Sequence, residues 1–322
     1  MKMTKSLTVV FLASALVFIN INAQERNDVI KVYNEGAKSM QTDLPAAINA
    51  FESVITLSDQ VGESANDLKQ KAMQVLPGLY LKSANNVVKE NKSVPEIVQA
   101  AKVAVAATDK YGTATHKETA KKLMVQAYNI MGTSYFTDKD YENALLAFDS
   151  LLIVDPDYSN AIYNKALVYR SQNNSEAFEE AIDLYLSKLA PGTDDERSKQ
   201  ASSMALEYFR AAGSQANQAE NLDEALLLLD KAAKYGDDKD LFYFFADVYN
   251  KQSKFDSGAE YAQKGLDMET GDAEAKAKFY FQLGLAQAGK GQTAEACASF
   301  KNSLYGPFAE PSKAQRTNLK CQ

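Results

Sequence analysis

Residues 125–158, with the sequence VQAYNIMGTSYFTDKDYENALLAFDSLLIVDPDY, decide the fold of this chain. Apolar and aromatic residues return at spacings of three and four on both sides of a polar centre, which predicts two amphipathic helices. The centre, Thr137 to Asp140, supplies turn and N-cap side chains. The second helix ends before Pro156, because a proline there cannot continue it. The stretch therefore predicts a helix–turn–helix unit.

A fixed spacing of small and bulky residues connects the two helices. From Gly132, Ala144 lies 12 positions and Phe148 lies 16 positions further along the chain. A small residue on the first helix lets the second helix approach, and the residues one turn apart on the second helix fill the remaining space. The same offsets recur three times, at Gly213, Ala225 and Leu229, at Ala246, Gly258 and Ala262, and at Gly284, Ala296 and Phe300. The unit is therefore an internal repeat.

One further copy begins at Ala166, a full 34 positions after Gly132. Its partners Ala181 and Tyr185 come three residues late, which predicts a longer turn around residues 172–175. Much of the remaining chain follows the same pattern less regularly.

The N-terminal part of the chain is the less regular one. Gly36 starts a copy whose partners, Ala47 and Phe51, come one residue early. Residues 61–112 predict one degenerate helix pair, and Pro77 is expected to kink or break its first helix. An irregular spacer that continues the stack and a functional hinge are the two interpretations of this segment.

The order of these residues resembles the tetratricopeptide repeat: an aromatic, a pair like Leu-Gly, a tyrosine, then Ala, Phe and Pro at fixed spacing. The resemblance covers most of residues 29–310. It implies an all-α fold, a right-handed superhelix of about six helix pairs, closed by a capping helix over 311–322. A second irregular link, at 190–195, predicts a division into an N-terminal array, 24–190, and a C-terminal array, 191–322.

The first 23 residues predict a secretory signal peptide. Lys2 and Lys5 precede an apolar run over 7–21, and the small residue Ala23 ends the segment. An uncleaved membrane anchor is the alternative, but the run is shorter than the roughly 20 residues that a spanning helix needs. We therefore expect an exported protein that is periplasmic, associated with the cell envelope or secreted, and that has no membrane segment after cleavage.

The charge of the expected mature chain limits its partners. Without Lys2 and Lys5, 33 basic residues face 42 acidic ones, a formal charge of −9. Such a field gives no attraction to nucleic acid or to anionic lipid.

The two cysteines are expected to form a disulfide. Cys297 lies on the second helix of the last repeat and Cys321 near the end of the closing helix, and an exported chain leaves the reducing cytoplasm. Such a bridge stabilises by about 3 kcal/mol. Two separate thiols are the alternative.

Catalytic and metal-binding signals are weak. The chain has a single histidine, His116, which we expect to be a solvated or capping residue. Residues 284–291 resemble the start of a phosphate-binding loop, but Gly291 stands where a Ser or Thr would hold magnesium. Asp155 and Asp157 fit turn and N-cap roles better than a calcium loop. We expect no catalytic residue, no metal site and no cofactor.

The resemblance implies that the first helices line a concave groove for an extended peptide or a partner's helix. Outward positions on these helices combine aromatic contact area with amide and guanidinium hydrogen bonding. They are Asn129, Tyr163, Asn164, Arg170, Arg210, Tyr243, Asp247 and Asn250, and a merely solvated face is the alternative for each. The family's clamp for C-terminal carboxylates also needs lysines, which do not accompany Asn129 and Asn164.

These patterns predict a noncatalytic protein–protein interaction scaffold of the bacterial cell envelope. An enzyme with accessory repeats is disfavoured, because the array leaves no room for a catalytic domain. An exported glycan or nutrient receptor is the second alternative. It is disfavoured because the chain has no tryptophan to stack on sugars, and because no lipid-attachment cysteine follows the apolar run.

Overall fold

The computed structural model describes residues 25–189 and 196–322, and throughout these two ranges the regular structure is helical, with no strand. This confirms the predicted all-α fold. The chain forms two compact units, the first ending at Val168 and the second beginning at Tyr169. The expected signal peptide, 1–23, and the link at 190–195 lie outside the described residues. The predicted division at 190–191 therefore stays a prediction.

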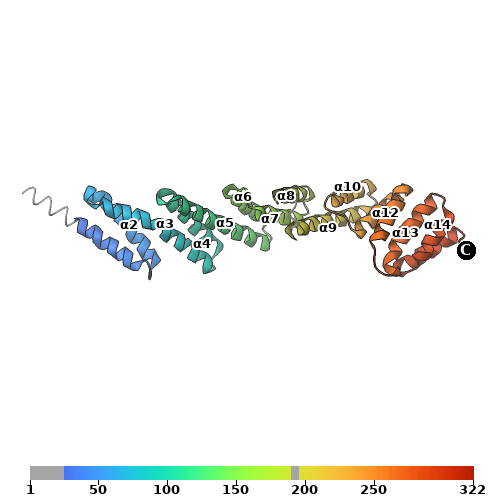
Figure 1. Ribbon diagram of the computed structural model, residues 1–322, viewed down its shortest axis with the longest axis horizontal. Coiled ribbons are helices and arrows are strands. Elements are labelled where there is room, and N and C mark those ends of the chain that lie inside the picture. The colour runs from blue at the N-terminus through green and yellow to red at the C-terminus, as the bar shows by residue number, and fades with distance from the viewer. Residues whose placement is uncertain (1–24, 190–195) are drawn as a thin grey trace, which may run out of the picture. The chain divides into compact units, whose positions relative to one another are not determined.

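Consecutive helices of the first unit pack on one another, α2 on α3, α3 on α4, α4 on α5 and α5 on α6 (Figure 1). Its elements are a helix over 25–39, α2 (Leu44–Val61), the 3₁₀ turn η1 (Glu63–Ala65), α3 (Asn66–Lys89), α4 (Val94–Tyr111), α5 (Ala114–Thr137), α6 (Tyr141–Val154) and most of α7 (Ser159–Ser171). Helices α3 and α4 confirm the degenerate pair predicted over 61–112.

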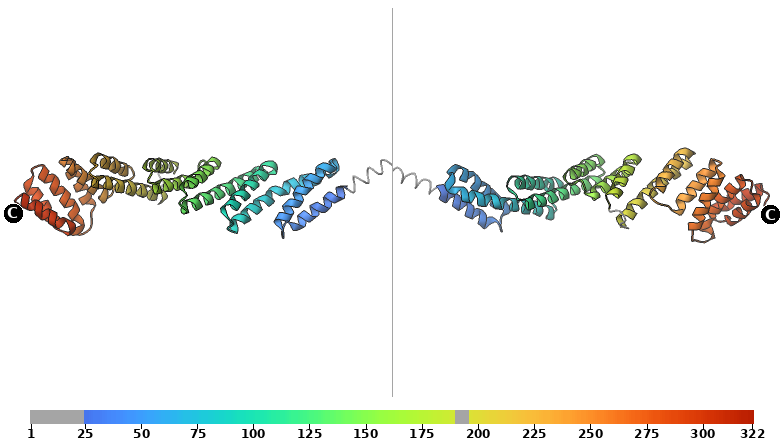
Figure 2. Two further views of the ribbon diagram at one scale, coloured as in Figure 1. Left: turned by 180° about the vertical axis from the view of Figure 1, so that it is seen from behind. Right: turned by 45° about the horizontal axis from the view of Figure 1, so that its top comes forward.

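The second unit repeats this arrangement, and Figure 2 shows its orange and red helices side by side in both views. Its elements are α8 (Ser175–Lys188), α9 (Glu196–Gln218), α10 (Leu222–Ala233), α11 (Lys239–Lys251), α12 (Phe255–Met268), α13 (Ala273–Gly289), α14 (Thr293–Asn302), the 3₁₀ turn η2 (Gly306–Phe308) and α15 (Ala309–Asn318). Within this unit α9/α10, α11/α12 and α13/α14 pack as helix pairs, and α15 follows them as the expected cap.

Five of the pairs share one turn geometry. In each, three residues separate the helices, and the middle one has a positive φ: Lys139, Asn173, Glu220, Ser253 and Gly291. The residue after it donates its N–H to a carbonyl five positions back, as in Asp140 to Tyr135 and Asn174 to Tyr169. This satisfies a carbonyl that the helix end leaves unpaired.

The longer turn expected around 172–175 is therefore wrong. Helix α7 ends at Ser171 and α8 begins at Ser175, which is the same separation as in the other pairs. The residues at the repeat's offsets from Ala166 are Phe178 and Ile182, and both are fully buried. The repeat thus stays in phase there, with larger side chains in place of the expected alanine and aromatic residue.

Close approach at small residues holds the regular pairs together. A Cβ atom added to Gly132 would lie 2.5 Å from the ring of Phe148, and one added to Gly284 would lie 2.7 Å from the ring of Phe300. Gly213 faces Leu229 in the same way. The three facing side chains are at most 1% exposed. These contacts confirm the structural roles that the spacing predicts.

Helix α3 continues through Pro77, so the expected break at this residue is wrong. Pro77 lies inside a helix that runs without interruption from Asn66 to Lys89. A proline in a helix interior costs about 3 kcal/mol, because it removes one backbone hydrogen bond and crowds the preceding turn. Burial of the neighbouring Leu76 and Leu79 against α2 and its core offsets this cost.

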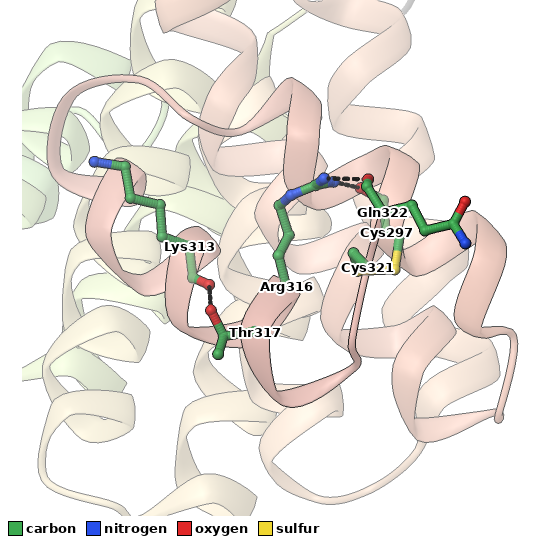
Figure 3. Close-up of a disulfide and its surroundings, with 6 residues drawn as sticks. All are labelled: Cys297, Lys313, Arg316, Thr317, Cys321 and Gln322. Atoms are coloured by element: carbon green, nitrogen blue, oxygen red, sulfur yellow. Dashed lines mark hydrogen bonds between the residues drawn. A yellow bond between two sulfur atoms is a disulfide. The ribbon is translucent and has the colours of Figure 1, made fainter.

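The C-terminal cap is joined to the last pair by the expected disulfide. Cys297 of α14 and Cys321, three residues after α15, are bonded, with their Cα atoms 5.5 Å apart (Figure 3). Arg316 of α15 donates hydrogen bonds to the backbone oxygen atoms of Cys297 and Gln322. The end of the chain is thus fixed to α14 by a covalent bond and by a charged side chain.

Candidate functional site

The predicted groove residues fall on both units. In the first, Asn129 lies on α5 and lines a cleft of about 340 Å³ with Gln126 and Tyr158. Its buried Oδ1 has no hydrogen-bond partner. Tyr163 and Asn164 are half-buried on α7. The other predicted residues belong to the second unit.

Three first helices of the second unit and the turn η2 enclose a cleft of about 680 Å³, which we call the first-helix cleft. It brings together Arg210 and Tyr243, two of the predicted residues. Its full lining is Arg210, Ala211, Ser214, Gln215 and Gln218 from α9, Asp240, Tyr243 and Phe244 from α11, Lys278 from α13, and Phe308 from η2. Phe308 lies outside the repeats, so the repeat spacing gives no signal for it.

The cations of the first-helix cleft are neutralised by neighbouring carboxylates. Arg210 forms an ion pair with Asp238, the N-cap residue of α11, which also accepts the N–H of Leu241 at 2.7 Å. Lys278 pairs with Asp240. Burial tends to raise the pKa of Asp240, but the hydrogen bond and positive charge of Lys278 outweigh it and hold this pKa below its usual value. The cleft therefore presents charges that already have partners.

Aromatic rings form the other wall of the first-helix cleft. The ring of Tyr243 lies 5.3 Å from that of Phe244 and 6.5 Å from that of Phe308, in edge-to-face arrangements. Phe308 also contacts Phe281, at 5.5 Å between centroids. Burial raises the pKa of Tyr243, and the negative charge of Asp247 raises it further, so this hydroxyl stays protonated in ordinary conditions.

Two side-chain amides of the first-helix cleft form no hydrogen bond within the described part of the chain. Gln215 and Gln218 are exposed and lie three residues apart on α9, so they share one face of this helix. Neither side-chain amide has a hydrogen-bond partner among the described residues, whereas other cleft-lining polar groups, such as Arg210 and Asp240, are paired. Each amide offers one acceptor and two donor hydrogens to a bound molecule.

Asp247 and Asn250 take part in a polar ladder between first helices. Asp247 of α11 accepts from Asn217 of α9 at 2.6 Å and from Gln282 of α13 at 2.9 Å. The Asn250 amide donates to the backbone and side-chain oxygens of Gln282, both at 2.9 Å. Lys251 adds a hydrogen bond to Asn217 Oδ1. These contacts join α9, α11 and α13.

The expectation that Asn250 faces outward is wrong, because the structure buries it. The side chain is held between α11 and α13 by its bonds to Gln282. Asp247 keeps 21% of its side chain exposed, with its carboxylate already engaged. The periodicity places both residues on the correct side of α11, but it does not show that the next helix covers them.

A second cleft, of about 1010 Å³, lies between the end of α7, the start of α8 and helices α9 and α10. Arg170 and Arg210 both line it, together with Glu207, Tyr208 and Leu228. Arg170 is exposed. Burial raises the pKa of the Tyr208 hydroxyl, and the positive charge of Arg170 partly opposes this rise. The structure thus brings the two predicted arginines to this second cleft. Arg210 also lines the first-helix cleft.

The features that resemble catalytic or nucleotide sites have structural roles. His116 is in the first turn of α5, where its Nδ1 accepts the N–H of Thr113 at 3.3 Å and its own N–H bonds to Thr113 Oγ1. This confirms the expected capping role. Gly284 faces Phe300, as described above. Within 25–189 and 196–322, no three His, Cys, Asp or Glu side chains gather as a metal site would require. No helix in these ranges has the length and apolarity to cross a bilayer.

In the regular pairs a small residue packs against a bulky one at fixed offsets, and a turn of three residues joins the two helices. The pair that begins at Gly132 is followed by another whose small residue, Ala166, lies 34 positions later. In these features the helix pairs resemble the tetratricopeptide repeat. Solved structures similar to the chain include the MamA protein, with 20% identity, 62% of this chain and 96% of that chain covered, and a TM-score of 0.35. A tetratricopeptide repeat protein from Parabacteroides merdae shares 18% identity over 92% of this chain and 99% of its own, with a TM-score of 0.30.

A third similar structure is YrrB, described as a tetratricopeptide repeat protein with an unusual peptide-binding site. It has 16% identity, coverage of 58% and 91%, and a TM-score of 0.35. Similarities at these identities concern the fold alone. No family model matches the sequence, and no curated protein does.

Proposed function

We propose that this chain is a noncatalytic scaffold that binds a partner protein in the first-helix cleft. The observation that carries the proposal is the combination of an aromatic wall, Tyr243, Phe244 and Phe308, with the unpartnered amides of Gln215 and Gln218. Aromatic rings give a partner large contact area, and the amides can pair with a peptide backbone. Stacked helical repeats commonly bind partners in this way.

We further propose that the partner is met in the bacterial cell envelope, after export. The disulfide supports an oxidising compartment, and the N-terminal sequence supports secretion. Intact mass of the protein from the envelope fraction tests this: cleavage after Ala23 is expected. A full-length chain recovered from the cytoplasm would contradict export.

Site-specific photo-crosslinking in living cells tests the binding site. A photoreactive phenylalanine at Ser214, inside the cleft, is compared with one at Leu227, which is 58% exposed on α10. We expect a discrete protein adduct from position 214 and none of the same mass from position 227. Adding Tyr243→Ala to the Ser214 probe variant should weaken the adduct, because it removes the central ring of the aromatic wall.

Two results would contradict the proposal. Equal adducts from both positions would show that the cleft is not the site. Recovery of a bound soluble glycan, with no protein adduct, would favour the receptor alternative.

A further inference from the structure

The C-terminal cap supplies part of the first-helix cleft. Phe308 is the last residue of η2, which packs on α13 and on α15. Its ring meets Tyr243 of α11 and Phe281 of α13. The repeats alone therefore provide only two of the three aromatic residues that line the cleft, and the third comes from the segment that follows them.

Three attachments hold this cap in place. Ser303 at the end of α14 and Ser312 on α15 are both fully buried, and their hydroxyls are 2.6 Å apart. Arg316 bonds to the backbone oxygen of Cys297, and the Cys297–Cys321 disulfide closes the far end of the cap, as Figure 3 shows. Because η2 lies between α14 and α15, these attachments fix both of its flanks.

The charges of the cleft point to an uncharged side chain beside Phe308. Arg210 and Lys278 are each paired with an aspartate, so a ligand carboxylate or ammonium group entering there would have to displace an existing partner. A charged group placed against the rings without a partner would lose its hydration. A large apolar side chain has no such hydration to lose, and it gains contact area against the three rings.

We propose that Phe308 is a specificity-determining residue that selects a peptide with a large apolar side chain, Leu, Met or Phe, and that the disulfide holds Phe308 in the cleft. The peptide backbone runs along α9, where Gln215 and Gln218 pair with its amides. This inference rests on the proposed function and names the chemistry of the partner.

A random twelve-residue peptide library displayed on phage, without cysteine, tests the inference on the oxidised mature chain, residues 24–322. We expect the enriched peptides to share one large apolar position. Phe308→Ala should lower their affinity by at least about tenfold, as loss of a buried aromatic anchor does, and Phe308→Leu should restore part of it. Tyr305→Ala is the matched control, because Tyr305 is 43% exposed and does not line the cleft.

The disulfide arm uses the double variant Cys297→Ser/Cys321→Ser and the wild-type chain treated with a soluble dithiol. The dithiol transfers two electrons and two protons to the cysteine sulfurs and becomes a disulfide itself. We expect both samples to bind the same peptides several-fold more weakly, with faster amide hydrogen exchange over 306–318. Unchanged exchange within α11 and α13 identifies a displaced cap rather than general unfolding.

The outcomes separate the two proposals. If no peptide is enriched on the oxidised chain, the proposed function fails and this inference falls with it. If peptides are enriched but bind Phe308→Ala and the reduced chain as tightly as the wild type, the inference is wrong while the proposed function stands. Enriched peptides whose common position is Asp, Glu, Lys or Arg would also overturn it.

Discussion

Helix pairs α11/α12 and α13/α14 follow the same repeat spacing, but the glycine at the close contact lies on the second helix of one pair and on the first helix of the other. In α13/α14 the small residue, Gly284, lies on the first helix and faces Phe300 of the second. In α11/α12 the close approach is at Gly258 of the second helix, where the amide of Asn250 from the first helix occupies the space that a Cβ would need. At the glycine, α13/α14 therefore packs a ring and α11/α12 packs an amide, while elsewhere in α11/α12 the ring of Tyr261 stacks on those of Phe245 and Tyr249.

This reversal links α11/α12 to its neighbour. Because Asn250 reaches past Gly258 with its Oδ1 buried and unpaired, its Nδ2 is free to donate to Gln282 of α13. The next glycine on α12, Gly265, packs against the ring of Phe279 from α13. The α11/α12 pair is held internally by the stacked rings of Phe245 and Tyr261, and Asn250 and Gly265 also join it to the following repeat.

The largest expected effect comes from removing the ring at the apolar contact. Phe300 is fully buried, so Phe300→Ala should lower the free energy of unfolding by about 3–5 kcal/mol. Amide hydrogen exchange measures this locally, and we expect α13 and α14 to lose protection before α9 and α10 do. Lys301→Ala, at an exposed neighbouring position, is the control and should change little. An equally small effect of Phe300→Ala would remove the distinction between the two pairs.

Breaking the disulfide should have the next largest effect. The bonded cysteines are 24 positions apart, and closing a loop of this length restricts the unfolded chain by about 3 kcal/mol. The variant Cys297→Ser/Cys321→Ser should therefore lower the thermal midpoint of the second unit, measured by calorimetry. Wild type in a dithiol should match it. A midpoint that does not move would show that Phe300 and the buried serines hold α14 and the cap without the bridge.

The repeat spacing predicts which helices approach but not which one supplies the filling side chain. Gly132, Gly213 and Gly284 could be assigned from the sequence because a bulky residue stands 16 positions later. Ala246, Gly258 and Ala262 are all small, so the sequence does not show that Asn250 occupies their contact. At Ala166, Phe178 and Ile182 stand at the repeat offsets without matching the pattern of an alanine followed by an aromatic residue, since the packing needs volume at these offsets rather than particular residue types.

The candidate site was predictable only in part, because the repeat pattern describes single helix pairs and not the contacts between successive pairs. Periodicity identifies the side of each first helix that the cleft uses, and it therefore predicts Arg210 and Tyr243. It contains no information on contacts between successive repeats, which bury Asn250, or on Phe308, which follows the last repeat. Such contacts depend on how far one pair is rotated against the next, and this is set by packing along the whole stack.

A moderate effect is expected at the amide contact. The Cβ of Gly258→Ala would meet Asn250 Oδ1 and displace an amide that is bonded to Gln282. Overpacking of this kind costs about 1–3 kcal/mol, so exchange should quicken in both α11 and α13. Ser257→Ala, one position earlier on α12, is the control. If only α12 responds, the link through Asn250 does not join the two repeats.

The smallest effect is expected at Glu269, which follows α12 and ties it to the start of α11. Its side chain is 5% exposed and lies 2.8 Å from Lys239 Nζ, and its carboxylate accepts the N–H of Gly271 at 2.8 Å. The hydrogen bond from Lys239 and that from Gly271 lower the pKa of Glu269. A lowered folded-state pKa means that the stabilisation is present above the unfolded value of about 4.3 and is lost as pH falls through the folded one.

Glu269→Gln should therefore destabilise α11 and α12 slightly at neutral pH, because the amide keeps the acceptor for Gly271 but loses the ion pair with Lys239. The difference from wild type should shrink as pH falls below the unfolded value of about 4.3, and vanish once pH is below the lowered folded-state pKa. Denaturant unfolding at several pH values measures it, and Glu260→Gln, on an exposed ion pair with Lys264, is the control. A difference that persists in acid would assign Glu269 a packing role in place of a charged one.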